Sequence, residues 1–366
     1  MKKLGFGLMR LPLLDRKDPK SIDMELLKKM VDTFIARGFT YFDTAWMYCG
    51  FSSEKATKEA LTSRYPRESY TLATKLHAEY FDNVESREAM FGKQLENTGV
   101  DYFDYYLLHD VNEKHLEVYD SLDCFTWLAE KKAQGLVRHM GFSFHDSPEL
   151  LDRLLTAHPD IEFVQLQINY LDWESEKVQS RRCYETAVKH GKKVIVMEPV
   201  KGGILAQVPA EAAEMFAGRN PAATAASWAV RFAASLENVM VVLSGMSDMA
   251  QVLDNTATMT AMEPLNSGER DMLLKAAEII RSHIEIPCTA CSYCTEGCPM
   301  GIPIPGYFSL YNQARQGRGS FSAYEKLSEG AGLASACVGC GQCEGVCPQH
   351  LPIRENLKKI AEYFED

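Results

Sequence analysis

Short apolar runs alternate with helical patterns through about the first 260 residues, and this alternation limits the fold more than any other feature of the sequence. The apolar runs have the length and composition of buried strands. They cover residues 4–8, 40–43, 70–75, 103–109, 137–143, 162–167, 193–197 and 239–244. Amphipathic helical patterns lie between or after them, at 23–37, 83–97, 116–134, 148–157, 175–190, 221–234 and 248–260. Eight strands alternating with helices in this length predict an α/β fold, a (β/α)8 TIM barrel.

The alternative is an open, doubly wound parallel sheet, which uses the same alternation of strands and helices. Such a sheet usually carries a glycine-rich phosphate loop between an early strand and its helix. Here the segment Gly5-Phe6-Gly7 continues into Leu8-Met9-Arg10 and not into a helix. The barrel is therefore the preferred prediction.

Composition and charge exclude several classes of protein. The 366 residues include 46% hydrophobic and 24% charged residues, which is ordinary for a globular protein with a sizeable core. The formal net charge of −11 argues against a nucleic-acid partner. No apolar run approaches the roughly 20 residues of a membrane helix, and the first residues lack a signal-peptide core. We expect a cytoplasmic protein with neither a nucleic-acid nor a membrane partner.

Eight of the 11 cysteines form two runs with identical spacing, C-x2-C-x2-C-x3-C-P. This spacing is typical of bacterial ferredoxins, in which the fourth cysteine of each run binds the other cluster. It predicts two 4Fe–4S clusters, one held by Cys288, Cys291, Cys294 and Cys347, the other by Cys337, Cys340, Cys343 and Cys298. A pair of zinc sites is the alternative, but zinc ligands more often come as two close pairs from separate places.

The same runs indicate how the chain is divided. We predict a barrel domain over residues 1–265, a connecting helix over 266–283 and a ferredoxin-like domain over 284–366. The segment between the cysteine runs carries helical patterns, so we expect a small, mainly α-helical iron–sulfur domain that ends in a C-terminal helix.

Polar residues of complementary type stand at the ends of three successive predicted strands. They are Asp43, Lys75 and His109, and Tyr48 follows Asp43 in the adjoining loop. Any one of them alone is explained by a structural role, as a polar group at a strand end or a helix cap. Together they fit proton transfer to a carbonyl oxygen, because a lysine cation lowers a phenol pKa, an aspartate fixes the lysine and a histidine orients the carbonyl. His77 and His145 lie in neighbouring loops, where we expect solvated histidines.

Several motifs resemble the aldo-keto reductases over about residues 4–260. They are FTYFDTAWMY at 39–48, TK at 74–75, GVDYFDYYLLH at 99–109 and GLVRHMGFS at 135–143. The resemblance implies a catalytic tetrad of Asp43, Tyr48, Lys75 and His109, with Tyr48 as general acid. It implies hydride transfer from NADP or NAD to an aldehyde or ketone, or the reverse reaction on an alcohol.

The resemblance also implies residues that bind the nicotinamide cofactor. Those expected to bind the nicotinamide are Ser143, Gln165, Asn169 and Met197, and those expected to bind the adenosine phosphate and adenine are Gly245, Ser247, Gln251 and Asn255. Three positions depart from the family pattern. Phe144 replaces the usual asparagine, Met197 a stacking aromatic residue, and Gln251 an arginine for the 2′-phosphate. The preference between NADP and NAD therefore stays open.

The clusters leave the source and fate of electrons open. They would pass electrons to a ferredoxin or flavodoxin-like partner, serve a bound flavin, reduce a substrate intermediate or close the structure. A flavin would join two-electron and one-electron steps, although the sequence carries no flavin fingerprint. The alternative function is a redox-sensing or iron-sensing regulatory protein built on a reductase scaffold.

Overall fold

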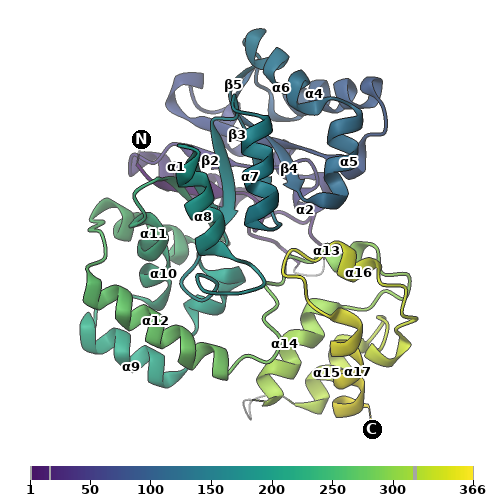
Figure 1. Cartoon of the computed structure of the whole chain (residues 1–366). Helices are drawn as coiled ribbons and strands as arrows, with labels where there is room; N and C mark the ends of the chain where they lie inside the picture. Colours follow the sequence, from purple (N-terminus) through teal and green to yellow (C-terminus); the bar gives the residue numbers. More distant parts are fainter. Residues whose placement is uncertain (1, 16–17, 316–319, 366) are drawn as a thin grey trace. The chain divides into compact units, whose positions relative to one another are not determined.

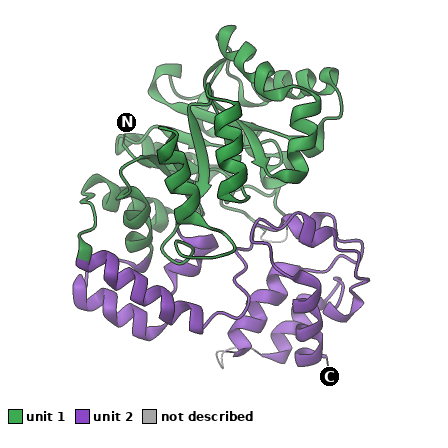
Figure 2. Cartoon of the chain, viewed as in Figure 1, with its two compact units in different colours: residues 1–199, 226–267 green, residues 200–225, 268–366 purple. Residues whose placement is uncertain are grey.

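The structure is a computed structural model that describes residues 2–15, 18–315 and 320–365 (Figure 1). The chain forms two compact units (Figure 2). The barrel unit comprises residues 1–199 and 226–267, and the helical unit comprises residues 200–225 and 268–366. Among the described residues, no helix combines the length and apolarity needed to cross a membrane.

Eight parallel strands close into a barrel in the barrel unit, and each strand pairs with its neighbours in chain order. This confirms the predicted fold class. The strands are β1 (Leu4–Gly7), β2 (Tyr41–Asp43), β3 (Thr71–His77), β4 (Phe103–Val111), β5 (Val137–Phe144), β6 (Phe163–Gln167), β7 (Lys193–Met197) and β8 (Val239–Gly245).

Amphipathic helices cover the outside of the barrel. They are α1 (Met24–Ala36), α4 (Val84–Thr98), α5 (Glu113–Ser121), α6 (Cys124–Ala133), α7 (Pro148–Ala157), α8 (Ser180–Lys189), α10 (Ala225–Ala234) and α11 (Met249–Thr260). Helix α1 begins where the Asp23 side chain accepts the Leu26 N–H, and its buried Leu27 and Phe34 lie seven residues apart on one face. The single helix predicted over 116–134 is wrong, because α5 and α6 are separated at Asp123, whose φ is +49°.

Short elements complete the barrel unit between β2 and β4. They are α2 (Tyr48–Phe51), α3 (Ser53–Thr57), a π-helical turn at Lys58–Thr62 and 3-10 turns at Arg67–Ser69 and Ala78–Tyr80.

One layer of side chains fills the inside of the barrel. It contains Tyr41, Ala73, Leu107, Phe163, Ile195, Val241 and Leu243. Gly141 lies beside this layer, and a Cβ at that position would come within 2.5 Å of the Phe163 carbonyl oxygen. The interior is therefore a packed core, which leaves the polar chemistry to the carboxyl ends of the strands.

The helical unit contains every cysteine of the two runs. Its elements are a 3-10 segment at Lys201–Ala206, α9 (Ala210–Arg219), α12 (Ser267–Ser282), α13 (Tyr293–Glu296), α14 (Ile304–Arg315), α15 (Phe321–Ser328), a 3-10 turn at Ala334–Ala336, α16 (Gln342–Gly345) and α17 (Ile353–Phe364). Its core includes Tyr307, Tyr324 and Ile360, and the two tyrosine rings stack with centroids 4.6 Å apart. The mainly α-helical character and the C-terminal helix were predicted. The inclusion of 200–225, which follows β7, was not indicated by any sequence pattern.

Candidate active site and cysteine sites

A buried ion pair lies at the carboxyl ends of β2 and β3. Lys75 Nζ is 2.5 Å from Asp43 Oδ1 and donates a second hydrogen bond to the Thr44 carbonyl oxygen at 2.7 Å. Both side chains are almost completely inaccessible to solvent. Burial raises the pKa of Asp43 and lowers that of Lys75, whereas their mutual attraction opposes both shifts. The pair fixes the lysine at one point of the site.

Tyr48 and His109 complete the predicted tetrad. The Tyr48 ring centroid is 5.0 Å from Lys75 Nζ and 5.9 Å from the His109 ring centroid. The short helix α2 carries Tyr48, and β4 carries His109. Within the described residues, His109 Nδ1 is buried and makes no hydrogen bond. The structure therefore brings all four predicted residues together.

The protonation state of this group differs from the prediction. Burial raises the pKa of Tyr48 well above its usual value, and the negative charges of Asp43 and Glu198 add to the effect. The expected lowering by Lys75 is wrong for this state of the protein, since the lysine charge is already paired with Asp43. Burial also lowers the pKa of His109 well below its usual value, so the imidazole is neutral.

A buried network of hydrogen bonds holds the backbone around Lys75 in place. Glu54 is 1% exposed, and its carboxylate accepts hydrogen bonds from Thr74 Oγ1, Gln94 Nε2 and Asn97 Nδ2. Gln94 also donates to the Lys75 carbonyl oxygen at 3.0 Å. Helices α3 and α4 thereby hold the end of β3 in place.

The residues predicted to bind the nicotinamide differ in whether their hydrogen-bonding groups are already paired within the protein. Ser143 Oγ accepts the Asp110 N–H at 2.8 Å, and so its own proton is free to be donated. Gln165 Oε1 is buried without a partner among the described residues, and its Nε2 lies 3.7 Å from Met197 Sδ. These two side chains offer one donor and one acceptor, the complement of a carboxamide. Asn169 instead holds a turn, binding Asp172 through both ends of its amide.

The residues predicted for the adenosine part gather between β8 and α11. The Ser247 N–H donates to Gln251 Oε1 at 2.8 Å, and Asn255 Nδ2 donates to Ser244 Oγ at 2.9 Å. Gly245 ends β8 beside the Arg10 side chain, which a Cβ at Gly245 would meet at 3.2 Å. Arg10 was not among the predicted residues. Its aliphatic carbons lie beside this turn, and its guanidinium is 3.8 Å from Glu198 Oε1.

The cysteines line two separate cavities in the helical unit. One is lined by Cys288, Cys291, Cys294 and Cys347, and the other by Cys298, Cys337, Cys340 and Cys343. Each cavity thus combines three cysteines of one run with the fourth cysteine of the other. A buried lysine, Lys201, donates from Nζ to Gln349 Oε1 at 2.9 Å, and Gln349 lines the first cavity.

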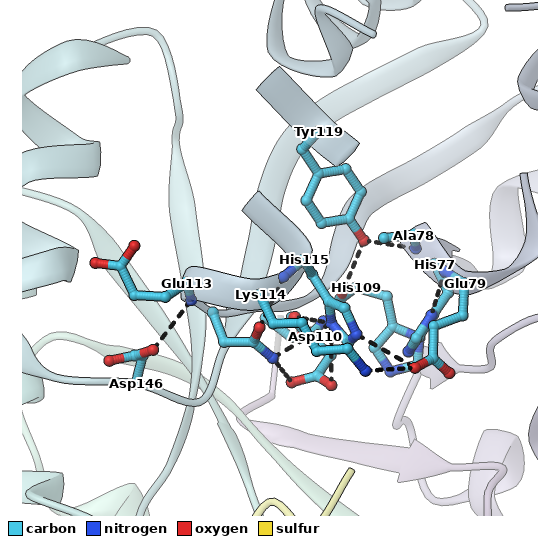
Figure 3. A network of polar contacts seen from close by, with 12 residues as sticks. His77, Ala78, Glu79, His109, Asp110, Glu113, Lys114, His115, Tyr119 and Asp146 are labelled. Carbon is cyan, nitrogen blue, oxygen red and sulfur yellow. Dashed lines mark hydrogen bonds and ion pairs between the residues drawn. The ribbon is translucent and has the colours of Figure 1, made fainter. Parts of the chain in front are cut away.

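Sequence reasoning missed a polar group beside His109 (Figure 3). His77 was expected to be solvated and is 3% exposed, so that prediction is wrong. Strand β3 extends to His77, which pairs in register with His109 on β4. Asp110 and His115 come from the end of β4 and from α5. The sequence signal was limited to Asp110, which directly follows a residue assigned to the site.

Comparisons with known proteins agree with both halves of the chain. The sequence model of the Aldo/keto reductase family matches residues 3–275, and that of the 4Fe-4S dicluster domain matches residues 287–351. L-galactose dehydrogenase of Arabidopsis thaliana is 26% identical over 255 residues, which are 64% of this chain and 78% of that protein.

Two further similarities each concern one part of the chain. The "Acetyl-CoA decarbonylase/synthase complex subunit alpha 1" of Methanosarcina mazei is 32% identical over 75 residues, 20% of this chain, and the chain spans only 8% of that subunit. A crystal structure of an aldo-keto reductase from Klebsiella pneumoniae in complex with NADPH has a TM-score of 0.58 at 17% identity, and the alignment covers 75% of this chain and 90% of that one.

The family match extends over more than half of the sequence, and the closed eight-stranded barrel is the fold of the structural neighbour. The chain therefore belongs to the aldo/keto reductase family and carries a 4Fe-4S dicluster domain at its C-terminal side.

Proposed function

We propose that the barrel unit is an NAD(P)H-dependent reductase of an aldehyde or ketone, in which Tyr48 is the general acid. The observation that carries the proposal is the convergence of Asp43, Tyr48, Lys75 and His109 at one end of the barrel. A bound nicotinamide supplies the hydride in this chemistry. The matched donor and acceptor of Ser143 and Gln165 support its carboxamide at this place.

The protein side chains have separate tasks in this proposal. Tyr48 keeps its proton because its pKa is raised, and it donates that proton from Oη to the carbonyl oxygen of the substrate. Neutral His109 holds the same oxygen in line. Lys75 contributes a fixed positive charge that stabilises negative charge developing near Tyr48. Gly245, Ser247, Gln251 and Asn255 are proposed to bind the adenosine part, with Met197 at the nicotinamide edge.

We also propose that the eight cysteines hold two 4Fe–4S clusters. A 4Fe–4S cluster takes four thiolates, and each cavity presents four cysteine sulfurs in the crossed grouping of two-cluster ferredoxins. The match to a dicluster family favours this reading over zinc. Electron transfer to a ferredoxin or flavodoxin-like partner, or structural closure, is the proposed use of the clusters. A bound flavin is supported neither by a motif in the sequence nor by a feature of the described residues.

The test is the reduction of a panel of aldehydes and ketones by the anaerobically purified chain with NADH and with NADPH. Tyr48→Phe removes only the phenol oxygen, and we expect kcat to fall by roughly 10²–10⁴-fold, the usual contribution of a general acid. Tyr65→Phe is the matched control, because Tyr65 donates to Asp32 at 2.5 Å and plays no part in the site. Full activity in Tyr48→Phe, or none in the wild type, would contradict the proposal.

A further inference from the structure

Three metal-binding side chains meet beside the catalytic group without belonging to it. One potential ligand atom from each of His77, Asp110 and His115 lies within 4.8 Å of the other two. The residues come from β3, β4 and α5, and the His77 and His109 ring centroids are only 4.9 Å apart. Figure 3 shows their side chains converging, with Glu79 at the edge of the group.

The three side chains are largely buried. His77 and His115 are each about 95% or more buried, and the Asp110 side chain is 22% exposed. The charged members pair with one another and with Glu79, whose Oε1 is also 3.1 Å from Lys114 Nζ, and a metal ion would replace part of this pairing. The group lies at the top of a barrel, where family members of this fold carry chemistry.

The backbone of Asp110 is held in an unfavourable conformation. Its φ is +54°, in the left-handed region, and the pairing of β4 with β5 shifts register between Leu108 and Val111. Such a conformation costs of order 1–3 kcal/mol in a residue with a side chain. The local break in alternation turns the Asp110 side chain toward His115, with Nδ1 to Oδ2 at 3.4 Å.

The hydrogen bonds of His115 match those of a metal ligand. Its Nδ1 donates to the Asp110 carbonyl oxygen at 2.8 Å, since a carbonyl can only accept. That bond leaves Nε2 on the far side of the ring, 3.5 Å from Glu79 Oε1. Metal-binding histidines usually donate their second ring N–H to a carbonyl or carboxylate in this way. His77 Nδ1 accepts the Glu79 N–H at 3.2 Å, a bond that ligation through Nδ1 would replace.

From this arrangement we propose that His77, Asp110 and His115 form a binding site for a divalent transition-metal ion, with Glu79 as a fourth ligand. Two histidines and a carboxylate select ions of the zinc or iron(II) class over magnesium or calcium. Ligand atoms around tetrahedral zinc are roughly 3.4 Å apart, so the set must close by about an ångström on binding. Asp110 and Glu79 are the partly exposed members and supply that movement.

The experiment is a calorimetric titration of zinc chloride into the anaerobically purified chain with its cysteine sites loaded with iron. We expect one zinc ion per chain that depends on the three residues. His115→Ala and Asp110→Asn should each weaken binding by roughly 100-fold or more. His139→Ala is the matched control, an exposed histidine that bonds Glu162 at 2.9 Å, and it should bind zinc as the wild type does.

Two features keep the result unambiguous. Zinc captured by cysteines would survive His115→Ala, so equal binding by the wild type and this variant overturns the proposal, as does no binding by the wild type. His115→Gln retains a polar side chain at the position, and its circular dichroism and melting temperature separate loss of binding from loss of fold. The readout needs neither nicotinamide nor carbonyl, and the outcome is therefore independent of the proposed reductase activity.

Discussion

At the scale of single residues, the ion pair of Lys75 and Asp43 decides what Tyr48 can do. The ammonium group is 2.5 Å from Asp43 and has no contact with solvent, so its charge is largely compensated where it stands. Burial of Tyr48 then dominates and keeps the phenol protonated. The lysine acts as a fixed charge for the reaction and not as an agent that ionises the tyrosine beforehand.

A pH prediction follows from the raised pKa of Tyr48. An acid with a raised pKa retains its proton to higher pH, so the donor form is complete below the ordinary tyrosine value of about 10. We expect kcat/KM for carbonyl reduction to show no loss through Tyr48 ionisation as pH rises from about 7 to 9.5. The measurement is the pH profile of kcat/KM with saturating cofactor.

The profile has a clear contrary outcome. A fall of tenfold per pH unit within that range would place the ionisation of the donor below 9.5, and it would mean that Lys75 prevails over burial after all. Solvent isotope effects on the same profile tell whether the falling limb belongs to the proton donor.

At the scale of elements, the sequence predicted the strands well, because each buried strand is a short apolar run bounded by turns. The residues at strand ends were less accessible to prediction. Strand β3 continues to His77 and β4 to Val111, beyond their predicted ends at 75 and 109. His77 and Asp110 lie in these strand extensions and belong to the polar group of Figure 3. They come together because of the strand register and a bulge in β4, which the hydrophobic periodicity of the sequence does not reveal. Arg10 was missed for a similar reason, since only tertiary contact brings it to Gly245.

The two cysteine runs fold alike but with different residues at their strained positions. Ala290 and Ser292 have φ values of +52° and +69°, and the corresponding Gly339 and Gly341 have +74° and +77°. The left-handed conformation costs roughly 1–2 kcal/mol for residues with a Cβ and nothing for glycine. The first run therefore stores strain that the second run avoids.

We expect Ala290→Gly to stabilise the first cysteine loop by about 0.5–1 kcal/mol, since relief of strain exceeds the entropy that glycine adds to the unfolded chain. The measurement is the urea concentration at which the visible absorbance of the cluster-loaded protein is lost. Gly339→Ala is the matched reverse change, and a Cβ there meets no atom within 4 Å, so any loss reports backbone strain alone. An unchanged midpoint in both variants would show that the iron, and not the loop, sets the stability.

At the scale of the whole molecule, the chain joins a two-electron site to one-electron centres. A hydride carries both electrons together, whereas an iron–sulfur cluster accepts one at a time, and flavins normally connect the two. Neither the described residues nor the sequence shows a flavin-binding feature. Without a flavin, the barrel has no group that separates the two electrons of a hydride into one-electron steps.

We therefore expect anaerobic NADPH to leave the clusters oxidised while a carbonyl substrate is turned over, and dithionite to reduce them. Electron paramagnetic resonance measures both, because the reduced clusters are paramagnetic. A cluster signal that grows at the rate of NADPH oxidation would contradict this expectation and reveal an internal path for single electrons. The Tyr48→Phe variant is the control, since it removes carbonyl reduction but leaves any direct path to the clusters in place.

Asp110 takes part in two places at once. Its backbone N–H donates to Ser143, which we propose faces the nicotinamide, and its side chain faces His115 in the proposed metal site. An ion that moves Asp110 must also shift Ser143, so the two occupants are thermodynamically linked. Linkage is reciprocal: whatever factor zinc imposes on the dissociation constant of NADPH, NADPH imposes on that of zinc. Through Asp110, the affinity of the barrel for its nicotinamide cofactor would then depend on the concentration of free metal ion.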